Sequence, residues 1–295
     1  MDVYLNAVRE ALQTGRRKEN RTGVDTLSTF NINYEIDLRE GFPLLTTKEI
    51  SWKNIVVENL WFLSGETHIG LLRRHGCRFW DHWANETGHV PSAYGNFWRQ
   101  FPVHTDAGAP AFNDQLRWVL SELDRNPMSR RLVISAWAPE NAQRSALPPC
   151  HLLFIFNVQM DERGEPILCL HLTQRSCDIA LGVPYNIAGY AFILELVGRF
   201  SGIRPGILAH TLVDAHIYTS KPDGSMAEYD HVPSLLTQCG RTPRARPRLR
   251  IDPSIQTLDD LLTLARDETE TEVLMRHFEL TGYDPHPAIR FKVAV

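Results

Sequence analysis

Apolar residues recur along the chain with two periods, one typical of strands and one typical of helices. Over residues 29–38 they alternate with polar residues, which predicts a strand with one buried face. The short apolar run 152–158 predicts a buried strand. Spacings of three and four residues predict helices, and the predicted elements in chain order are helix 3–12, strand 29–38, helix 52–63, helix 114–124, strand 132–137, strand 152–158, strand 167–173, helix 187–200 and strand 213–218.

We find no internal repeat and no low-complexity linker, which predicts one domain spanning residues 1–295. Residues 102–113 have the composition of a loop. Residues 182–186 contain a glycine and a proline and predict a turn before the helix 187–200.

Composition and charge exclude several classes of partner. The chain is 43% hydrophobic and 22% charged with a net charge of −4, so no general attraction to nucleic acid or anionic membrane is predicted. The longest near-apolar run, 187–200, contains Glu195 and Arg199 and is too short to span a bilayer. The N-terminus carries no apolar signal segment. Five scattered cysteines predict neither a disulfide framework nor a metal site and fit a reducing, cytoplasmic location.

The segment 146–156 contains a candidate nucleophile. Pro148 and Pro149 stiffen the backbone directly before Cys150, and the predicted strand 152–158 follows. Cys150 is therefore predicted at the entrance of a strand, although a buried structural thiol fits the same local pattern. His151 is not expected to be its base, because consecutive side chains on a strand point to opposite faces.

Polar residues in loops and at strand ends are suited to binding a nucleotide. His216 and Tyr218 could contact the hydroxyls of a sugar, and the Asn186 amide pairs a donor with an acceptor, as the edge of uracil requires. Adjacent arginines point to different sides of a strand, so two neighbours can face one ligand only through a twist or a second subunit. These cations are also expected to lower the pKa of the candidate nucleophile. The arginines that could converge on a phosphate are Arg21, Arg130, Arg131 and Arg175.

Three further features admit both a structural and a functional interpretation. Residues 79–101 are rich in aromatic side chains with polar groups between them, which fits a core segment or the wall of a site for a flat heteroaromatic ligand. Glu58 lies among apolar residues of the predicted helix 52–63. It is either on the solvent-exposed face of that helix or a buried carboxylate with a role in catalysis or binding. The five arginines of residues 241–250 are interpreted as a solvated connector in preference to a nucleic-acid contact.

Motifs spread over essentially the whole chain resemble those of the thymidylate synthase family. The resemblance implies the fold class α/β (α+β), with a mixed, twisted β-sheet flanked by helices and the sheets of two chains packed back to back in a homodimer. The motifs are Arg21-Thr-Gly, Glu58 before Leu60-Trp61-Phe62-Leu63, Trp80-Asp81, Tyr94-Gly95, Ser129-Arg130-Arg131, Pro148-Pro149-Cys150-His151, Gln174-Arg175-Ser176-Cys177-Asp178, Leu181-Gly182-Val183-Pro184-Tyr185-Asn186, Asp214-Ala215-His216-Ile217-Tyr218 and Tyr283-Asp284-Pro285-His286-Pro287.

The resemblance also implies an activity and roles for particular residues. The activity is the reductive methylation of dUMP to dTMP with 5,10-methylenetetrahydrofolate as donor of the one-carbon unit and the hydride, and with no metal. Cys150 would attack C6 of dUMP, and Glu58 would handle protons with an ordered water and Tyr94. His151 and Asn186 complete the implied catalytic group. The nucleotide would be held by both subunits, with Arg21, Arg175, Ser176, Asp178, Asn186, His216 and Tyr218 in one chain and Arg130 and Arg131 in the other.

For the folate, the resemblance implies a set of contacts and a closing C-terminal segment that excludes water. Three departures from the family's pattern lie near the sugar and the base: Val213 replaces a glycine, Tyr185 replaces a phenylalanine, and Thr219-Ser220-Lys221 replaces an Asn-His pair. They leave open whether ribose is accepted and how the last chemical step ends. The implied folate contacts are Trp80, Asp178, Gly182 and Tyr218, with Lys48 at the glutamate tail and the carboxylate of Val295 as the latch.

Three alternatives stay open on the sequence alone. A hydroxymethylase of dUMP, UMP or CMP would share the fold and the covalent adduct, but water instead of hydride would complete its product. Trp80 favours methylation, and a cytosine-specific enzyme would be expected to carry an acid in place of Asn186. A nucleic-acid or regulatory binder would use the arginines of 241–250. A cysteine hydrolase would need a histidine that is distant in the sequence but close to Cys150 in the fold. It would also leave unexplained the arginines that are suited to binding a phosphate.

Overall fold

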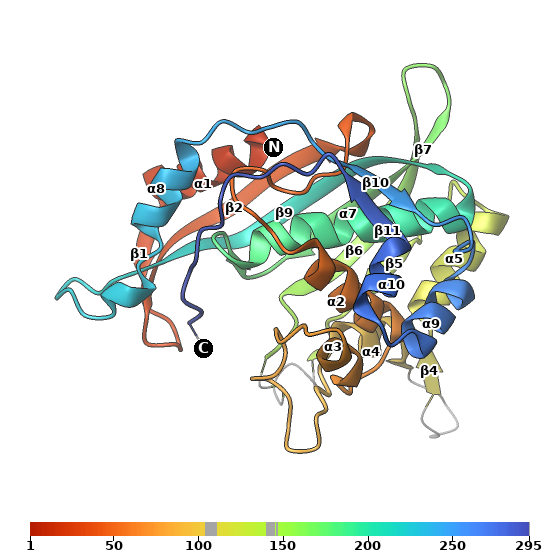
Figure 1. Ribbon diagram of the computed structural model, residues 1–295, viewed down its shortest axis with the longest axis horizontal. Helices are drawn as coiled ribbons and strands as arrows, with labels where there is room; N and C mark the ends of the chain where they lie inside the picture. The colour runs from red at the N-terminus through yellow and green to blue at the C-terminus, as the bar shows by residue number, and fades with distance from the viewer. Residues whose placement is uncertain (104–110, 140–144, 146, 295) are drawn as a thin grey trace.

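One large sheet forms the centre of the fold, and its long strands run over helix α7 (Figure 1). The structure, a computed structural model, describes residues 1–103, 111–139, 145 and 147–294. The strands follow the order β1-β2-β9-β7-β6-β5, and β8 pairs with β9. Their bounds are β1 Arg16–Lys18, β2 Asp25–Asp37, β5 Val133–Ser135, β6 His151–Met160, β7 Pro166–Gln174, β8 Cys177–Asp178 and β9 Arg204–Thr219.

The sheet is mixed, which confirms the predicted fold class. β7 and β8 run parallel to β9, whereas the pairs β1–β2, β2–β9, β5–β6 and β6–β7 are antiparallel. Parallel neighbours need a long crossover, which α7 (Gly182–Ser201) supplies between β7 and β9. Every strand predicted from hydrophobic alternation is present in this sheet.

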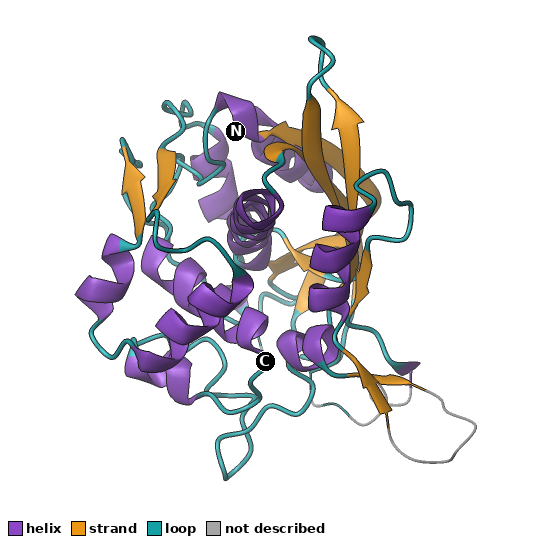
Figure 2. Ribbon diagram, turned by 90° about the vertical axis from the view of Figure 1, so that its right-hand side faces the viewer, coloured by secondary structure: helices purple, strands orange, loops and turns teal. Residues whose placement is uncertain are grey.

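Helices form a second layer, and Figure 2 shows α7 end-on between the sheet and that layer. α7 is apolar on nearly all sides because both layers pack against it. In the described part of the chain, no helix is long and apolar enough to cross a membrane. The other helices are α1 Asp2–Thr14, α2 Trp52–Ser64, α3 Gly70–Arg74, α4 Tyr94–Arg99, α5 Gln115–Arg125, α8 Val232–Cys239, α9 Leu258–Asp267 and α10 Thr271–Arg276, with 3-10 turns η1 Leu38–Glu40 and η2 Ala227–Tyr229.

Two sequence predictions differ from the observed structure. Residues 182–186 are the first turns of α7 and not a separate turn, because a proline within the first turn of a helix loses no intrahelical hydrogen bond. The predicted loop 102–113 contains parts of two short paired strands, β3 Phe101–Val103 and β4 Ala111–Asn113, while residues 104–110 lie outside the described residues.

The segment 241–250 joins α8 to β10 (Arg248–Ile251). Arg244, Arg248 and Arg250 are exposed, as expected of a solvated connector, while two half-buried arginines also bind the body of the protein. Arg241 donates from Nη1 to the carbonyl oxygens of Thr47 and Pro287, at 2.8 and 2.7 Å. Arg246 donates to the carbonyl oxygen of Asp37 at 2.7 Å. β10 pairs with β11 (Phe278–Thr281). Arg241 and Arg246 thus tie the segment to the main chain of three other parts of the protein.

The two faces of the sheet differ in burial. Side chains that face α7, such as Phe154 and Leu172, are buried. On the opposite face, Val133, Ile155 and His171 are direct neighbours across β5, β6 and β7. Ile155 and His171 are half-buried and Val133 is exposed, so this face presents a partly apolar surface in the single chain.

Candidate active site

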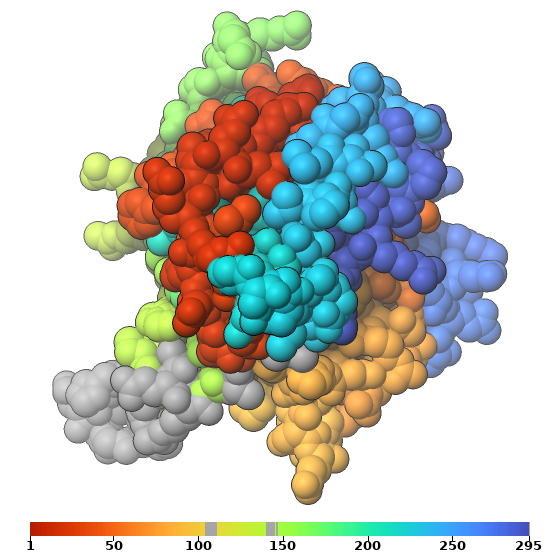
Figure 3. All heavy atoms as spheres, turned by 90° about the vertical axis from the view of Figure 1, so that its left-hand side faces the viewer, coloured from red at the N-terminus to blue at the C-terminus, as the bar shows by residue number. Residues whose placement is uncertain are grey.

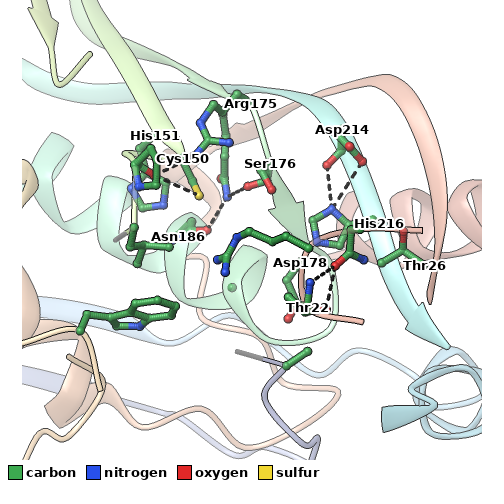
Figure 4. A pocket seen from close by; sticks show the side chains of 18 of the residues that line it. Thr22, Thr26, Cys150, His151, Arg175, Ser176, Asp178, Asn186, Asp214 and His216 are labelled. Atoms are coloured by element: carbon green, nitrogen blue, oxygen red, sulfur yellow. Dashed lines mark hydrogen bonds and ion pairs between the residues drawn. The ribbon is translucent and has the colours of Figure 1, made fainter. Parts of the chain in front are cut away.

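A cavity of about 730 Å³ lies where the ends of β6, β7 and β9 meet helices α2, α4 and α7, and it gathers most of the predicted site residues (Figure 4). Lys48, Arg130 and Arg131 are not among the side chains that line it. Val295 lies outside the described residues. The predicted residues that line the cavity are Arg21, Glu58, Trp80, Tyr94, Cys150, His151, Arg175, Ser176, Asp178, Gly182, Asn186, His216 and Tyr218.

Cys150 is held by its main chain at the rim of the sheet. Its N–H donates to the Tyr94 hydroxyl at 2.9 Å, and its carbonyl oxygen accepts from the Arg175 N–H at 2.8 Å. β6 begins at the next residue, with a shift of register against β7 between His151 and Leu153. This mounting agrees with the predicted position of Cys150 at the entrance of a strand, and it directs the thiol into the cavity.

Arg175 links the cysteine segment to the candidate anion site. Its Nε and Nη2 donate to the carbonyl oxygens of Pro149 and Pro148, at 2.9 and 2.8 Å. These bonds use two of the five N–H donors of the guanidinium group, so the others can bind an anion in the cavity. The two prolines thus fix the backbone and present carbonyls that orient Arg175.

Burial raises the pKa of the Cys150 thiol, in contrast to the expected net lowering. Arg175 and Arg21 do act in the expected direction, since their charges stabilise the thiolate. Desolvation outweighs them in the single chain. The sequence could identify the cations but not the extent of burial.

Glu58 and Tyr94 are brought together by close packing of α2 and α4. A Cβ atom at Gly95 would lie 2.0 Å from the carbonyl oxygen of Phe62, so only glycine allows this approach. Glu58 is half-buried by its exposed surface, and desolvation raises its pKa to about 7, while a hydrogen bond from Trp80 Nε1 to its Oε1 at 2.7 Å partly opposes that rise. Glu58 is therefore a largely desolvated carboxylate that lines the cavity, and its role in handling protons stays a prediction.

His151 follows Cys150 in the chain, and its ring packs against Tyr94. Its ring stacks on Tyr94 with centroids 4.5 Å apart, and its Nδ1 has no hydrogen-bond partner among the described residues. Burial lowers the pKa of His151 to about 4, so the ring is neutral at physiological pH.

His216 and Tyr218 project from β9 into the opposite end of the cavity. Asp214 lies on the same side of the strand and approaches His216 Nδ1 to 3.5 Å through its Oδ1 (Figure 4). Burial disfavours the charged ring of His216, but the hydrogen bond and the charge of Asp214 outweigh it and raise the pKa. Asp214 itself is held by Ser28 at 2.8 Å and by an ion pair with Lys18.

The first turns of α7 carry the residues that face the centre of the cavity. Asp178 organises the entry to the helix, since its Oδ1 accepts from the N–H groups of Ala180 and Leu181 at 2.9 and 3.1 Å. Asn186 follows one turn after Gly182, and its Oδ1 accepts a hydrogen bond from Gln174 Nε2 at 3.0 Å. Both side chains are thereby fixed by bonds within the protein.

Lys48 lies outside the cavity. Its Nζ donates to the carbonyl oxygen of Ala180 at 2.5 Å and lies 4.5 Å from the centre of the Phe291 ring. Burial lowers the pKa of Lys48 to about 8. In this arrangement its charge is engaged by the main chain that leads into α7 and by the C-terminal segment.

The C-terminal segment reaches the cavity. The carbonyl oxygen of Lys292 accepts from His231 Nε2 at 2.9 Å, and the Lys292 ammonium lies 3.3 Å from Glu228. Figure 3 shows this segment, in dark blue, beside the cyan segment that follows β9. Ala294 lines the cavity, so the chain end adjoins the site in which a closing role is predicted.

Arg130 and Arg131 lie in a second cavity with Glu122, Asn126 and Met128. Their placement away from the Cys150 cavity agrees with the expectation that they do not serve the site of their own chain.

Sequence reasoning missed several lining residues. Gln174 and Asp214 stood inside the quoted motifs, and the alternation of β9 would have placed Asp214 on the same side as His216. The missed lining residues are Lys18, Asn20, Thr22, Thr26, Phe62, Trp83, Ser145, Leu147, Gln174, Asp214 and Ala294.

In the described ranges there is no group of three or more His, Cys, Asp or Glu side chains that could hold a metal ion.

Fold and cavity together define an α/β enzyme in which a thiol, a desolvated carboxylate and arginines surround one site. The family model described as thymidylate synthase matches residues 2–295. The chain is 43% identical to a thymidylate synthase of Haloferax volcanii, over 98% of this chain and 96% of that protein. The chain belongs to the thymidylate synthase family, and it is a methyltransferase that converts dUMP to dTMP, as the motifs predicted. Members of this family use methylenetetrahydrofolate as cosubstrate.

Proposed function

We propose that Cys150 is the nucleophile of dUMP methylation and that residues 1–295 act as one catalytic domain. The observation that carries the proposal is the position of the thiol, which lies between the guanidinium of Arg175 and the amide of Asn186 in one cavity. An anion at the arginine end and a pyrimidine edge at Asn186 would place C6 of the base near the thiol. The free cysteines of the described chain fit the proposed cytoplasmic location.

Proton loss from the thiol is coupled to nucleotide binding in this proposal. The thiolate forms a bond to C6, and the electron pair of the C5–C6 double bond moves toward C5 and O4. C5 would then bond to the one-carbon unit of the folate. Its proton would leave to a base, the folate nitrogen would depart from the one-carbon unit, and a hydride from the folate would reduce that carbon to a methyl group as the thiolate is expelled and the C5–C6 double bond re-forms. Arg175 and Arg21 stabilise the thiolate that enters and leaves this cycle.

Methylenetetrahydrofolate would supply the one-carbon unit and the hydride when bound. The cavity fits such a molecule, because Trp80, Trp83 and Phe62 line it with aromatic surface suited to a flat ring system. Gly182 and Asp178 line the same cavity beside the entry to α7. We assign these residues to folate binding, and we place Tyr218 between the folate and the nucleotide sugar.

The tail of the folate and the closing segment are assigned to the C-terminal side of the cavity. Lys48 would contact the glutamate tail only after its contact with Phe291 is rearranged, since its Nζ is buried here. We propose that residues 291–295, with the carboxylate of Val295, move as the cavity closes.

We propose a homodimer with shared active sites, in which Arg130 and Arg131 of each chain bind the phosphate in the other. Two observations support this. The two arginines lie outside the cavity of their own chain, and the face of the sheet that carries Val133, Ile155 and His171 presents apolar side chains without full burial. Packing two such faces together would bury them, in a symmetric arrangement.

The direct test of the activity is a product assay with dUMP and methylenetetrahydrofolate. We expect dTMP and dihydrofolate to form in equal amounts, which is visible as a rise in dihydrofolate absorbance. Hydroxymethyl-dUMP together with tetrahydrofolate would instead show that water completes the reaction. Running UMP and dCMP in parallel measures the preference for sugar and base.

Replacing Trp80 with phenylalanine is expected to shift the pH dependence of proton removal from C5. Removal of this proton needs Glu58 as a carboxylate, so tritium release from C5-labelled dUMP should rise with pH around 7. Loss of the Trp80 hydrogen bond raises the pKa of Glu58 further, which moves the midpoint to higher pH and slows release at pH 7 about fivefold. Trp83→Phe, which removes no bond to Glu58, should keep the midpoint, and an unchanged midpoint in Trp80→Phe would refute the assignment.

Replacing Asn186 with aspartate is expected to weaken discrimination against dCMP. A protonated carboxyl can donate to N3 of cytosine, where the amide of Asn186 is matched to uracil. The ratio of kcat/KM for dUMP to that for dCMP should fall by about tenfold or more. If selectivity is unchanged, the base is read by other residues.

A further inference from the structure

His231 lies between the end of β9 and the start of α8, where it contacts the C-terminal segment. Its side chain is buried. Its main-chain N–H donates to the carbonyl oxygen of Tyr218 at 3.0 Å, and its own carbonyl oxygen accepts from the N–H of Leu235 at 2.9 Å. Because Tyr218 belongs to β9 and Leu235 to α8, two regular elements fix the position of His231.

The imidazole ring of His231 binds the main chain of Lys292. Its Nε2 lies 2.9 Å from the carbonyl oxygen of Lys292, and because a carbonyl oxygen only accepts, Nε2 carries a proton and donates it to this bond. The same ring packs against the ring of Phe291, with centroids 4.9 Å apart. His231 thus holds two consecutive residues of the chain end, one through a hydrogen bond and one through ring packing.

The side chain of Lys292 makes a second set of contacts at the surface. Its ammonium group lies 3.3 Å from the Glu228 carboxylate and 4.3 Å from the centre of the Tyr229 ring. Lys292 and Glu228 are both about half exposed, so water screens their attraction and the pair contributes little. The bond to His231 ends in a buried ring and is better shielded. We therefore expect this bond to dominate the attachment of the segment.

The attachment lies within a short reach of the Cys150 cavity. Ala294, two residues after Lys292, lines this cavity. Two residues of extended chain span at most about 7 Å, so a bond at Lys292 keeps the chain end at the cavity. Tyr218, whose carbonyl oxygen holds His231, lines the same cavity.

We propose that His231 is a positioning residue that anchors the C-terminal segment at Lys292 both before and after the cavity closes. This role rests on the proposed closing motion and narrows it. The ring of Phe291 and the residues beyond Lys292 would move, while the main chain of Lys292 stays bound to His231. Closing then orders only the last few residues instead of capturing a free chain end, which lowers its cost in conformational entropy.

Trypsin measures release of the anchor, because it can cleave after Lys292 only when that residue has left His231 and Glu228. The cleavage frees Val293-Ala294-Val295, and mass spectrometry of the remaining chain distinguishes it from cleavage at other basic residues. While its rate is proportional to the trypsin concentration, it reports the fraction of released segments. We expect His231→Phe, which keeps an aromatic ring and removes the donor, to speed this cleavage about tenfold.

Two control variants separate the hydrogen bond from the other contacts. Glu228→Gln removes only the surface ion pair, so its cleavage rate should stay within about twofold of wild type. His231→Gln can place an N–H near the position of Nε2 and should stay within about threefold. Equal rates in His231→Phe and wild type, or an equal acceleration by Glu228→Gln, would overturn the anchor.

The same cleavage with dUMP and tetrahydrofolate bound tests whether the anchor persists in the closed cavity. Closing should slow the cleavage of wild type, and His231→Phe should remain about tenfold faster, because the bond is present in the docked segment with and without ligands. A ratio near one would show that the bond breaks on closing and would overturn the inference. If the ligands do not slow the cleavage of wild type, it is the proposed closing motion that fails.

If His231→Phe does not fold, His231→Met and His231→Gln decide. The two side chains have similar lengths, and only glutamine has an N–H donor. His231→Met should release the tripeptide about tenfold faster than His231→Gln. Equal rates in these two variants would contradict the proposal.

Discussion

Replacing Cys150 with alanine is expected to lower the rate of dTMP formation by a factor on the order of 10⁴ or more. Without the thiol, C5 of the base gains no electron density from an adduct, and no other group in the cavity offers a comparable nucleophile. Binding of dUMP should persist, because the arginines and Asn186 are unchanged. The measurements are the rate of dihydrofolate formation and the Kd for dUMP.

Cys239→Ala is the matched control. Cys239 is a half-buried cysteine at the end of α8, away from the cavity, and its loss should leave the rate within about twofold of wild type. Substantial turnover by Cys150→Ala would remove the covalent mechanism. A Cys150→Ala chain that no longer binds dUMP would show that the thiol segment builds the nucleotide site as well.

Mixing Arg130→Ala chains with Cys150→Ala chains is expected to restore activity that neither variant has alone. In a mixed dimer, the site that contains the intact Cys150 receives the intact Arg130 of the other chain. Random exchange of subunits makes half of the dimers mixed, with one complete site in each, so activity should approach about a quarter of wild type. Turnover is measured after the subunits have been exchanged.

The control mixture combines Arg175→Ala with Cys150→Ala. Arg175 acts beside the cysteine of its own chain, to which it is bound through Pro148 and Pro149, so this mixture should stay inactive. Restoration in the control and not in the Arg130 mixture would reverse the assignment of these arginines to the two chains. No restoration in either mixture would mean that each chain is self-sufficient.

Elements with a strong period were predictable from the sequence because local chemistry specifies them. The alternation in 29–38 gave β2, and the helix 114–124 begins after Asp114, whose side chain accepts from the N–H of Arg117 at 3.0 Å. The first turns of α7 were missed because proline is common both in turns and in the first turn of a helix. Pro184 alone therefore does not distinguish the two structures.

The site was predictable in its residue types and less so in their connections. Motifs brought Cys150 and Arg175 to one cavity, but the bonds from Arg175 to the proline carbonyls depend on how two strand ends meet. The hydrogen bond from His231 to Lys292 likewise requires the start of α8 to meet the C-terminal segment. The burial that raises the pKa of Cys150 depends on packing from several elements, so no local pattern reports it.

Mass spectrometry of a trapped adduct tests the central claim most directly. With 5-fluoro-dUMP and methylenetetrahydrofolate, no proton can leave C5, so an adduct formed on the enzyme should accumulate. We predict that digestion yields the peptide containing Cys150 with the added mass of the nucleotide and folate, and that the other cysteine peptides are unmodified. An enzyme that methylates dUMP yet traps no adduct, or traps it on a different residue, would contradict the assignment of Cys150.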